Sequence, residues 1–280
     1  MTTHTQAATQ TNHSMLFTDS HCHLDFTEFQ NDLAHLVEQC SLLAIKRIII
    51  PSVGPENWQR VLQLVNQPTL RNHLSLFPCL GIHPWYLEAL SPDELTNLSE
   101  LASVNQAQLF AIGECGIDGV IAKQQDNLAK QRYFFEQQLQ LSKQLNLPVV
   151  VHHRQSHDQV LACLKSAKLT CGGILHAFSG SYQQALQYIE LGFKLGIGGT
   201  ITYARAKKTI NAVKKLPLEA LVLETDAPAM PLYGFQGEIN SPIRITQVFA
   251  QLALIRSESA QQIAEQLEQN IDQLIPFLAN

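Results

Sequence analysis

Residues 148–154 read PVVVHHR, in which three consecutive valines give way to two histidines and an arginine. A strand without polar alternation is typical of a parallel sheet, because helices cover both of its faces. Residues 48–50 read III and form a second run of the same kind. The two runs predict a buried parallel sheet, and the first of them ends in polar side chains.

Similar apolar runs alternate with longer amphipathic segments from about residue 16 to about residue 226, which is the pattern of repeated βα units. The eight predicted strands are Leu16–Asp19, Arg47–Pro51, Leu74–Leu80, Leu109–Gly113, Pro148–Val151, Gly173–Leu175, Phe193–Ile197 and Leu221–Glu224. Eight such units that close on themselves form an α/β fold of the TIM (β/α)8 barrel type. A doubly wound open sheet is the structural alternative.

The segments between the strands predict helices. They are Asp32–Leu43, Glu56–Val65, Asp126–Leu145, Asp158–Ser166, Tyr182–Leu191 and Arg205–Lys215, and two more helices near Ile243–Arg256 and Ala260–Leu274 finish the chain. At one helix start, Ser91 suits the N-cap, Pro92 suits the first helical position and Glu94 completes a capping box. Because no linker rich in Gly, Ser or Pro divides the chain, we expect a single domain over residues 15–280 after a flexible N-terminal tail at 1–14.

Composition limits the classes of function. Hydrophobic residues make up 45% of the 280 residues and charged residues 15%, so the chain can bury a sizeable core. The net charge of −5 argues against a protein that resides on nucleic acid or on an anionic membrane. Any nucleic acid would be a substrate that is held locally. No membrane association and no obligatory protein partner are expected.

The six cysteines are scattered without a CxxC pair, and no segment resembles a signal peptide or a membrane span. We therefore expect reduced thiols and a cytoplasmic location. Several motifs of other enzyme classes, HExxH, GxSxG, the P-loop and a GxGxxG that opens a helix, are absent. Residues 196–200, GIGGT, suit either a phosphate-binding loop or a tight turn after the seventh strand.

Polar residues follow the predicted strands at their carboxyl ends, which in a barrel meet on one face. They are His21 and His23 after the first strand, His83 after the third, Glu114 after the fourth, His152 to Arg154 after the fifth, His176 after the sixth and Asp226 after the eighth. Taken singly, each has an ordinary structural interpretation, such as a salt bridge for Glu114 or an N-cap for Asp226. Together they indicate a metal site, because His21 and His23 share one face of an extended strand and reach the same ion.

The donors are nitrogen and oxygen atoms, which suit Zn²⁺, Mn²⁺ or Mg²⁺ better than soft thiolate chemistry. Six ligands exceed the needs of one tetrahedral catalytic zinc ion. The set therefore predicts two divalent ions that share a bridging carboxylate.

At this point the residues resemble a known family, the TatD-type metal-dependent DNases of the amidohydrolase superfamily. The resemblance spans nearly the whole chain after Leu16. Its motifs are DSHCHLD at 19–25, GIHP at 81–84, GECGID at 113–118, PVVVHHR at 148–154, HAFSG at 176–180 and ETDAP at 224–228. Residues 230–237, MPLYGFQG, look like the subgroup typified by the bacterial YjjV proteins.

The resemblance implies that His21, His23 and Asp226 hold one ion, that His152 and His176 hold the second, and that Glu114 bridges them. Members of this family cleave phosphodiesters, and several act as 3′ to 5′ exonucleases on single-stranded DNA. Two departures flank the expected mouth. Residues 119–122, GVIA, replace a continuation that often contains tyrosine, and residues 229–231 lengthen the loop after Asp226.

The favoured hypothesis is an enzyme that hydrolyses phosphoesters, with DNA as substrate and a water activated by two metal ions. Glu114 and Asp226 are the expected catalytic residues, and Asp226 is the candidate proton acceptor or donor. His83 and Arg154 are expected to hold the phosphate, since the planar guanidinium matches phosphate oxygens. A loop-packing role is the alternative for His83. His153 is expected to point away from the site.

Two other hypotheses keep the barrel. One is a binuclear hydrolase of a small amide, lactone or other ester. Deaminase-like relatives place a glutamate shortly after the histidine of strand six, where this chain has Ala177 to Gly180, and many amidohydrolases use a carbamylated lysine where this chain has Glu114. The other is a non-enzymatic barrel whose metals only stabilise it, which chelation would unfold.

Overall fold

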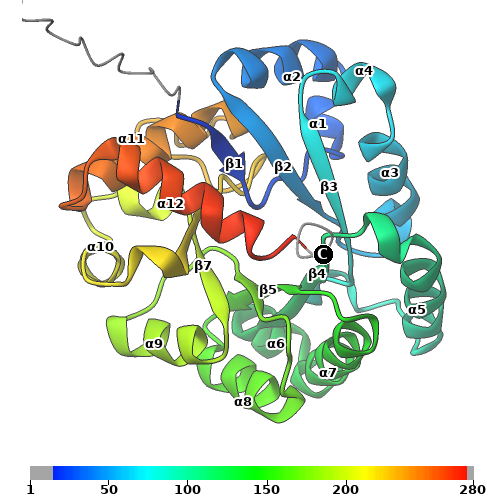
Figure 1. Cartoon of the computed structure of the whole chain (residues 1–280). Helices are drawn as coiled ribbons and strands as arrows, with labels where there is room; N and C mark the ends of the chain where they lie inside the picture. Colours follow the sequence, from blue (N-terminus) through cyan, green and yellow to red (C-terminus); the bar gives the residue numbers. More distant parts are fainter. Residues whose placement is uncertain (1–14, 276–280) are drawn as a thin grey trace, which may run out of the picture.

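Each predicted apolar run forms a strand of one parallel sheet in the computed structural model, which describes residues 15–275. The strands are β1 (Phe17–Asp19), β2 (Ile45–Pro51), β3 (Ser75–Leu80), β4 (Ala111–Asp118), β5 (Val149–Arg154), β6 (Gly173–Leu175), β7 (Phe193–Ile197) and β8 (Leu221–Leu223). They pair in chain order, and the helices surround them (Figure 1). The predicted TIM (β/α)8 barrel is confirmed.

The barrel closes through the segments that follow β8 and β1. Ser20 donates its backbone N–H to the carbonyl of Leu223 at 2.8 Å, and Asp226 donates to the carbonyl of His21 at 2.9 Å. His23 donates to the carbonyl of Ala227 at 2.8 Å. The hydrogen bonds that close the barrel therefore also set the histidines of the HxH motif beside Asp226.

The helices between and after the strands are α1 (Thr27–Gln30), α2 (Leu33–Leu42), α3 (Pro55–Val65), α4 (Pro68–Arg71), α5 (Asp93–Asn105), α6 (Gly119–Gln125), α7 (Leu128–Leu145), α8 (His157–Ala167), α9 (Tyr182–Glu190), α10 (Lys207–Val213), α11 (Ile245–Ile255) and α12 (Ala260–Asp272). Short 3-10 turns include η1 (Pro84–Tyr86) and η3 (Gly199–Thr202). Since α12 crosses the barrel in Figure 1 and its Ile271 packs with strand residues, the end of this helix covers one opening of the barrel.

The apolar core has an outer and an inner part. Val149 and Val151 belong to the large cluster between the strands and the helices, whereas Val150 belongs to the smaller cluster inside the barrel. The inner cluster also contains Ile49, Cys79, Ala111, Ile174 and Val222, together with Leu274 and Ile275 beyond α12. Both faces of the sheet are therefore buried, as the valine run at 149–151 predicts.

Two helix predictions are wrong in detail. The predicted helix 126–145 forms as α7 but begins only at Leu128, because Asp126 lies in the left-handed region at φ 50° and ends a separate short helix, α6, which was not predicted. The predicted capping box at Ser91 does not form. Ser91 Oγ accepts from the backbone N–H of Asp93 at 3.2 Å, and the Glu94 carboxylate accepts from Asn97, so α5 begins only at Asp93.

The strand predictions end too early at β4 and β5. β4 continues beyond Gly113 to Asp118 and β5 continues beyond Val151 to Arg154. In the added part of β4, Cys115 and Ile117 pack in the outer core, which leaves the alternate residues for the barrel side. The polar side chains thus lie within the strands rather than after them.

Within residues 15–275, no helix is both long enough and apolar enough to cross a membrane. The predicted tail at 1–14 lies outside the described residues, and the single domain over residues 15–280 stays a prediction.

At Gly116, the backbones of β4 and β5 lie too close together to admit a side chain. Its φ is +151°, and an added Cβ would lie 2.1 Å from the carbonyl oxygen of His152. We expect Gly116→Ala to cost about 2–4 kcal/mol of unfolding free energy through the clash and the strained φ. Thermal unfolding measures this loss. Gly54→Ala is the matched control, since nothing lies within 4 Å of its added Cβ, and an equal loss in both variants would contradict the account.

Candidate metal centre

The six predicted ligands come together at the carboxyl end of the barrel. His21 Nε2 lies 3.0 Å from Glu114 Oε2 and 3.3 Å from His23 Nε2, and His23 Nε2 lies 3.5 Å from the same carboxylate oxygen. Asp226 Oδ1 lies 3.7 Å from both imidazole nitrogens. Ligands about 2.1 Å from one ion lie roughly 3.0–3.4 Å apart at octahedral or tetrahedral angles. His21, His23 and Glu114 therefore fit one metal ion.

The other oxygen of Glu114 faces a second group of imidazoles. Oε1 lies 2.9 Å from His152 Nδ1, 3.3 Å from His83 Nε2 and 3.9 Å from His176 Nε2. Glu114, His83 and His152 form a second set of side chains that could hold a metal ion. The two oxygens of one buried carboxylate thus point toward two separate groups of donors, as a bridging ligand would.

His83 lies closer to this centre than sequence reasoning placed it. Its Nδ1 accepts a hydrogen bond from the backbone N–H of Trp85 at 3.1 Å, which leaves Nε2 to carry the proton. Burial lowers the pKa of His83 to about 4. The imidazole is therefore a neutral donor at the mouth. Its position beside Glu114 and His152 would also allow it to hold an ion, but only in the other tautomer, in which Nδ1 carries the proton and the hydrogen bond from Trp85 is lost.

A third set of possible ligands contains a residue to which the sequence analysis gave no role. Glu224 Oε1 lies 3.2 Å from His176 Nδ1 and accepts from the backbone N–H of Ala177 at 2.7 Å. His21, His176 and Glu224 are close enough to share an ion, and the rings of the two histidines stack at 3.7 Å. Since Glu224 is on the Nδ1 side of His176, it can also orient that ring while Nε2 faces Glu114.

The glycines at 196–200 are explained by Glu224. An added Cβ at Gly196 would lie 2.0 Å from Glu224 Oε2, and one at Gly198 would lie 3.3 Å from its Cγ. Gly196 and Gly198 make room for this buried carboxylate, and Gly199 lies against Met230 and Leu232, so the sequence GIGGT has packing reasons that do not require a bound phosphate.

Two further contacts set the HxH segment. His23 Nδ1 lies 3.1 Å from the carbonyl oxygen of Pro51, so Nδ1 donates the hydrogen bond and Nε2 is free for an ion. Asp19 is fully buried and accepts from the backbone N–H groups of His21 and Thr225 and from the Thr225 hydroxyl, at 3.2, 3.0 and 2.6 Å. It therefore fixes the ends of β1 and β8 relative to each other.

His152 is oriented by Asp118, which the sequence analysis quoted but did not assign. Asp118 Oδ2 lies 3.4 Å from His152 Nε2 and accepts from Trp85 Nε1 at 2.6 Å. With its Nε2 proton directed at Asp118, His152 presents the lone pair of Nδ1 to the centre. Alternation along β4 places Glu114, Gly116 and Asp118 on one face, and this pattern could have revealed the role of Asp118.

Arg154 and His153 follow His152 and lie elsewhere. The Arg154 side chain is 52% exposed, and its Nη1 lies 3.7 Å from Asp118 Oδ2, which places the guanidinium at the rim. The ring of His153 packs against His157, Phe178 and Tyr188. His153 therefore points away from the ligand group, as expected.

In the centre, burial and the neighbouring charges act in opposite directions on the pKa values of Glu114 and His176. Burial opposes ionisation of Glu114, but the imidazoles of His83, His21 and His176 hold its pKa well below the usual range. Burial also opposes protonation of His176, but Glu224, Asp226 and Glu114 outweigh it and raise its pKa to about 10. Since a metal ligand must be deprotonated, binding at neutral pH displaces a proton from His176. The donor set fits a divalent cation, which would replace that proton.

A cavity of about 490 Å³ opens over the centre, within the size range of small-ligand sites. All the predicted ligands except the fully buried His21 line its floor, and its walls include Phe26, Trp85, Tyr86 and Met230. The site combines a polar floor with largely apolar walls.

Asp118→Asn is expected to weaken metal binding about 10–100-fold, as the loss of a partner that orients a ligand does. The amide does not hold the Nε2 proton as a carboxylate does, so His152 no longer keeps its Nδ1 lone pair on the centre. Isothermal titration with Mn²⁺ measures the change. Asp126→Asn is the matched control on an exposed loop. Asp118 Oδ1 also accepts from the backbone N–H groups of Val120 and Ile121 at the start of α6, and unchanged affinity in Asp118→Asn would show that this capping is its only role.

Comparison with known proteins agrees with this geometry. The family described as TatD related DNase matches residues 18–276. An uncharacterized metal-dependent hydrolase of Escherichia coli K12, YjjV, is 41% identical over 91% of this chain and 95% of its own length. An uncharacterized metal-dependent hydrolase of Haemophilus influenzae is 40% identical over 93% of this chain and 99% of its own.

The crystal structure of YjjV, a TatD homologue, superposes with a TM-score of 0.87 at 40% identity and covers 92% of this chain and 97% of that one. The length of the family match, the sequence identity to YjjV and the shared fold agree, and the chain belongs to the TatD family of metal-dependent hydrolases.

Proposed function

We propose that this chain hydrolyses phosphodiester bonds of DNA with two divalent ions, Zn²⁺, Mn²⁺ or Mg²⁺. His21, His23 and Asp226 would hold one ion, His152 and His176 would hold the other, and Glu114 would bridge them. The observation that carries the proposal is the placement of Glu114, whose two oxygens face two separate groups of imidazoles. The family description, TatD related DNase, supports DNA as the substrate.

Two bound ions would supply an activated water and neutralise the charge of the phosphoryl oxygens. The protein's own groups then move the proton. Asp226 Oδ1 lies 3.7–3.8 Å from the Nε2 atoms of His21, His23 and His176. Burial raises the pKa of Asp226 to about 6. A carboxyl group with this pKa can accept a proton from the attacking water and return it to the leaving oxygen.

Two residues at the mouth are suited to hold the phosphate. Arg154 presents a planar guanidinium at the rim, which can contact two phosphoryl oxygens at once. His83 directs an Nε2–H toward the centre and donates as a neutral imidazole. Together these two donors would fix the phosphorus in line for attack.

The test uses protein stripped of metal and reloaded in turn with Mg²⁺, Mn²⁺ or Zn²⁺. The substrates are 3′-labelled single-stranded DNA, a chromogenic phosphodiester and a chromogenic lactone. Metal-dependent release of nucleotides from the 3′ end is the expected result, with the stripped protein inactive but still folded by circular dichroism. Lactone cleavage without phosphodiester cleavage would overturn the proposal in favour of a hydrolase of carboxylic esters or amides. Unfolding on chelation without activity in any loaded form would indicate a structural metal.

A further inference from the structure

A second hollow adjoins the metal cavity on the side of β7 and β8. It has a volume of about 240 Å³ and is lined by Tyr203 and Arg205, together with Thr200 and Met230, which also line the metal cavity. The two hollows therefore share a wall. The second one is built by the segments after β7 and β8, which both carry residues of the metal centre or its surroundings.

Tyr203 lines the second hollow and contacts the ring of Tyr233, which lies next to the hollow. The rings of Tyr203 and Tyr233 meet edge to face at 5.8 Å. The Tyr203 hydroxyl donates to the carbonyl of Pro231 at 2.7 Å, and the backbone N–H of Tyr233 donates to Thr202 Oγ1 at 2.9 Å. Tyr233 nevertheless remains 66% exposed. A fixed and exposed aromatic ring is a stacking platform for a nucleic-acid base, whichever base it is.

Arg205 places a positive charge beside the tyrosine rings. Its guanidinium lies over the ring of Tyr203, 4.8 Å from the centroid. Among residues 15–275, no carboxylate lies within ion-pair distance of Arg205. Lys207 and Lys208 follow it in the chain and are exposed. The guanidinium can therefore contact a phosphate that lies beside a stacked base.

The charges around the mouth differ between its two sides. On the side of β7, Arg205, Lys207 and Lys208 are exposed, and burial together with the charge of Lys208 lowers the pKa of His157. On the side of β1 to β3, burial and the central Glu114 raise the pKa of Tyr86, and the carboxylates of Glu28, Asp25 and Glu56 contribute further. A polyanionic strand that enters the metal cavity is therefore attracted toward the side of Arg205.

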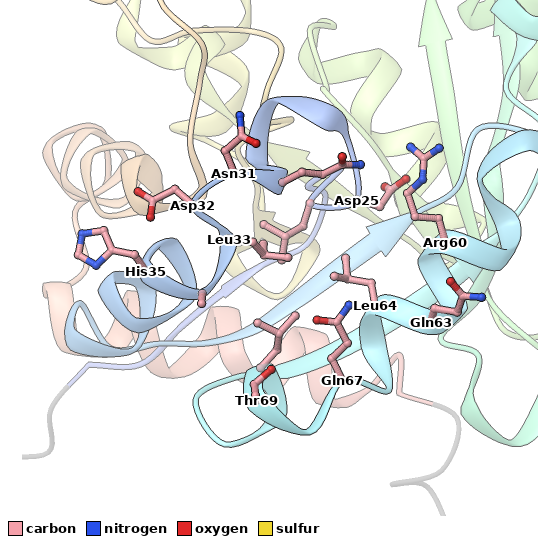
Figure 2. Close-up of a pocket in the computed structure, with 14 residues that line it drawn as sticks. Asp25, Asn31, Asp32, Leu33, His35, Arg60, Gln63, Leu64, Gln67 and Thr69 are labelled. Carbon is pink, nitrogen blue, oxygen red and sulfur yellow. The ribbon is translucent and has the colours of Figure 1, made fainter.

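A second candidate groove, the rival groove, lies on the side of β1 to β3, among α1, α2, α3 and α4 (Figure 2). It has a volume of about 490 Å³. Figure 2 shows Asp25 beside Arg60 at one end and Asp32 with His35 at the other, so the groove carries mixed charges. No aromatic Phe, Tyr or Trp side chain lines it within the described chain. It offers neither the stacking platform nor the net positive charge that a single strand needs.

We infer that Tyr203, Arg205 and Tyr233 form a binding surface for single-stranded nucleic acid, which holds the nucleotides that lie beyond the phosphate at the metal centre. This inference rests on the proposed phosphodiesterase activity and specifies the side of the mouth on which the strand lies. A base stacks on the exposed ring of Tyr233, which Tyr203 supports, and Arg205 contacts the backbone phosphate. The substrate is then recognised by length and strandedness rather than by sequence.

The test measures KM and kcat on single-stranded DNA of about 2 to about 12 nucleotides, beside a chromogenic phosphodiester. In the wild type, KM is expected to fall as the strand lengthens. Tyr233→Ala and Arg205→Gln are each expected to raise KM for the longest strand about tenfold, as the loss of one stacking contact does. Neither should alter kcat or the rate on the small substrate. Arg205→Gln should also reduce the salt slope of log KM by about 0.7, the effect of one lost phosphate contact.

Arg60→Gln is the matched control, because it removes the same charge from the rival groove. Equal KM for all lengths, or an effect of Arg60→Gln equal to that of Arg205→Gln, would overturn the surface. The proposed activity would still stand if the small phosphodiester is cleaved. If no DNA is cleaved, binding of the longest strand is measured by fluorescence anisotropy instead. Binding that Arg205→Gln weakens and Arg60→Gln does not would support the surface, and the absence of binding in the wild type would refute it.

Discussion

Glu114→Gln is expected to lose at least about 100-fold in metal affinity, since the loss of residues that merely orient ligands already costs about 10–100-fold. Glu114 is 2% exposed, and its two oxygens reach His21 and His23 on one side and His152 on the other. The amide keeps the shape but removes the negative charge and turns one acceptor into a donor. Both groups of imidazoles then face a neutral side chain, and hydrolysis is expected to fall below detection.

Titration calorimetry and metal analysis of the dialysed protein measure this effect. Gln138→Glu cannot serve as the control, because Gln138 is buried and its side chain is hydrogen-bonded to the backbone of Ile82. Glu136→Gln is the control, because it removes one carboxylate that pairs with Arg132 at the surface. Thermal unfolding of Glu114→Gln without metal is expected to show a folded protein. Two tightly bound ions in Glu114→Gln would rule out the bridging role.

Asp226→Asn is expected to lower kcat about 10²–10⁴-fold, the usual contribution of a general acid or base. The remaining amide oxygen can still contact an ion, but the side chain no longer exchanges a proton. In the wild type, activity should rise with pH as the carboxyl group ionises. Burial raises the pKa of Asp226 to about 6 before metal binds, and a bound cation shifts this limb to lower pH because it favours the carboxylate.

The pH profile separates this role from simple loss of metal. The acid limb of kcat should disappear in Asp226→Asn, whereas metal content at saturating concentration should stay close to that of the wild type. A variant that regains full kcat at high metal concentration would show that Asp226 is only a ligand. Asp226 would then be excluded as the proton acceptor.

The sequence predicted the barrel because its strands are almost wholly apolar. Runs such as residues 193–197 and 173–175 begin and end where the observed β7 and β6 do. The strand predicted for β4 ends at Gly113, because the next residue is a glutamate. In the structure, that glutamate lies inside the strand and faces the mouth, while Cys115 and Ile117 pack outward. A polar residue therefore does not end a strand when its side of the sheet faces a site.

The ligand group could be listed from strand ends, but its orientation could not. The rings of His23 and His152 are set by the carbonyl of Pro51 and by Asp118, which come from other strands. Asp226 lies in the left-handed region at φ 56° and depends on the hydrogen bonds that join β8 to β1. The contact of His23 spans 28 residues and that of His152 spans 34, whereas the contact of Asp226 with His21 spans about two hundred. No local pattern encodes contacts of this range. Metal ligation by the six residues stays a prediction.

Anomalous diffraction from crystals soaked in Mn²⁺ tests the central claim most directly, because it locates the ions against the side chains. Two anomalous peaks about 3.5–4 Å apart are expected, one on each side of the Glu114 carboxylate. One should contact His21, His23 and Asp226, and the other His152 and His176. A single peak, or two peaks that do not share Glu114, would contradict the account of a carboxylate-bridged pair of metal ions.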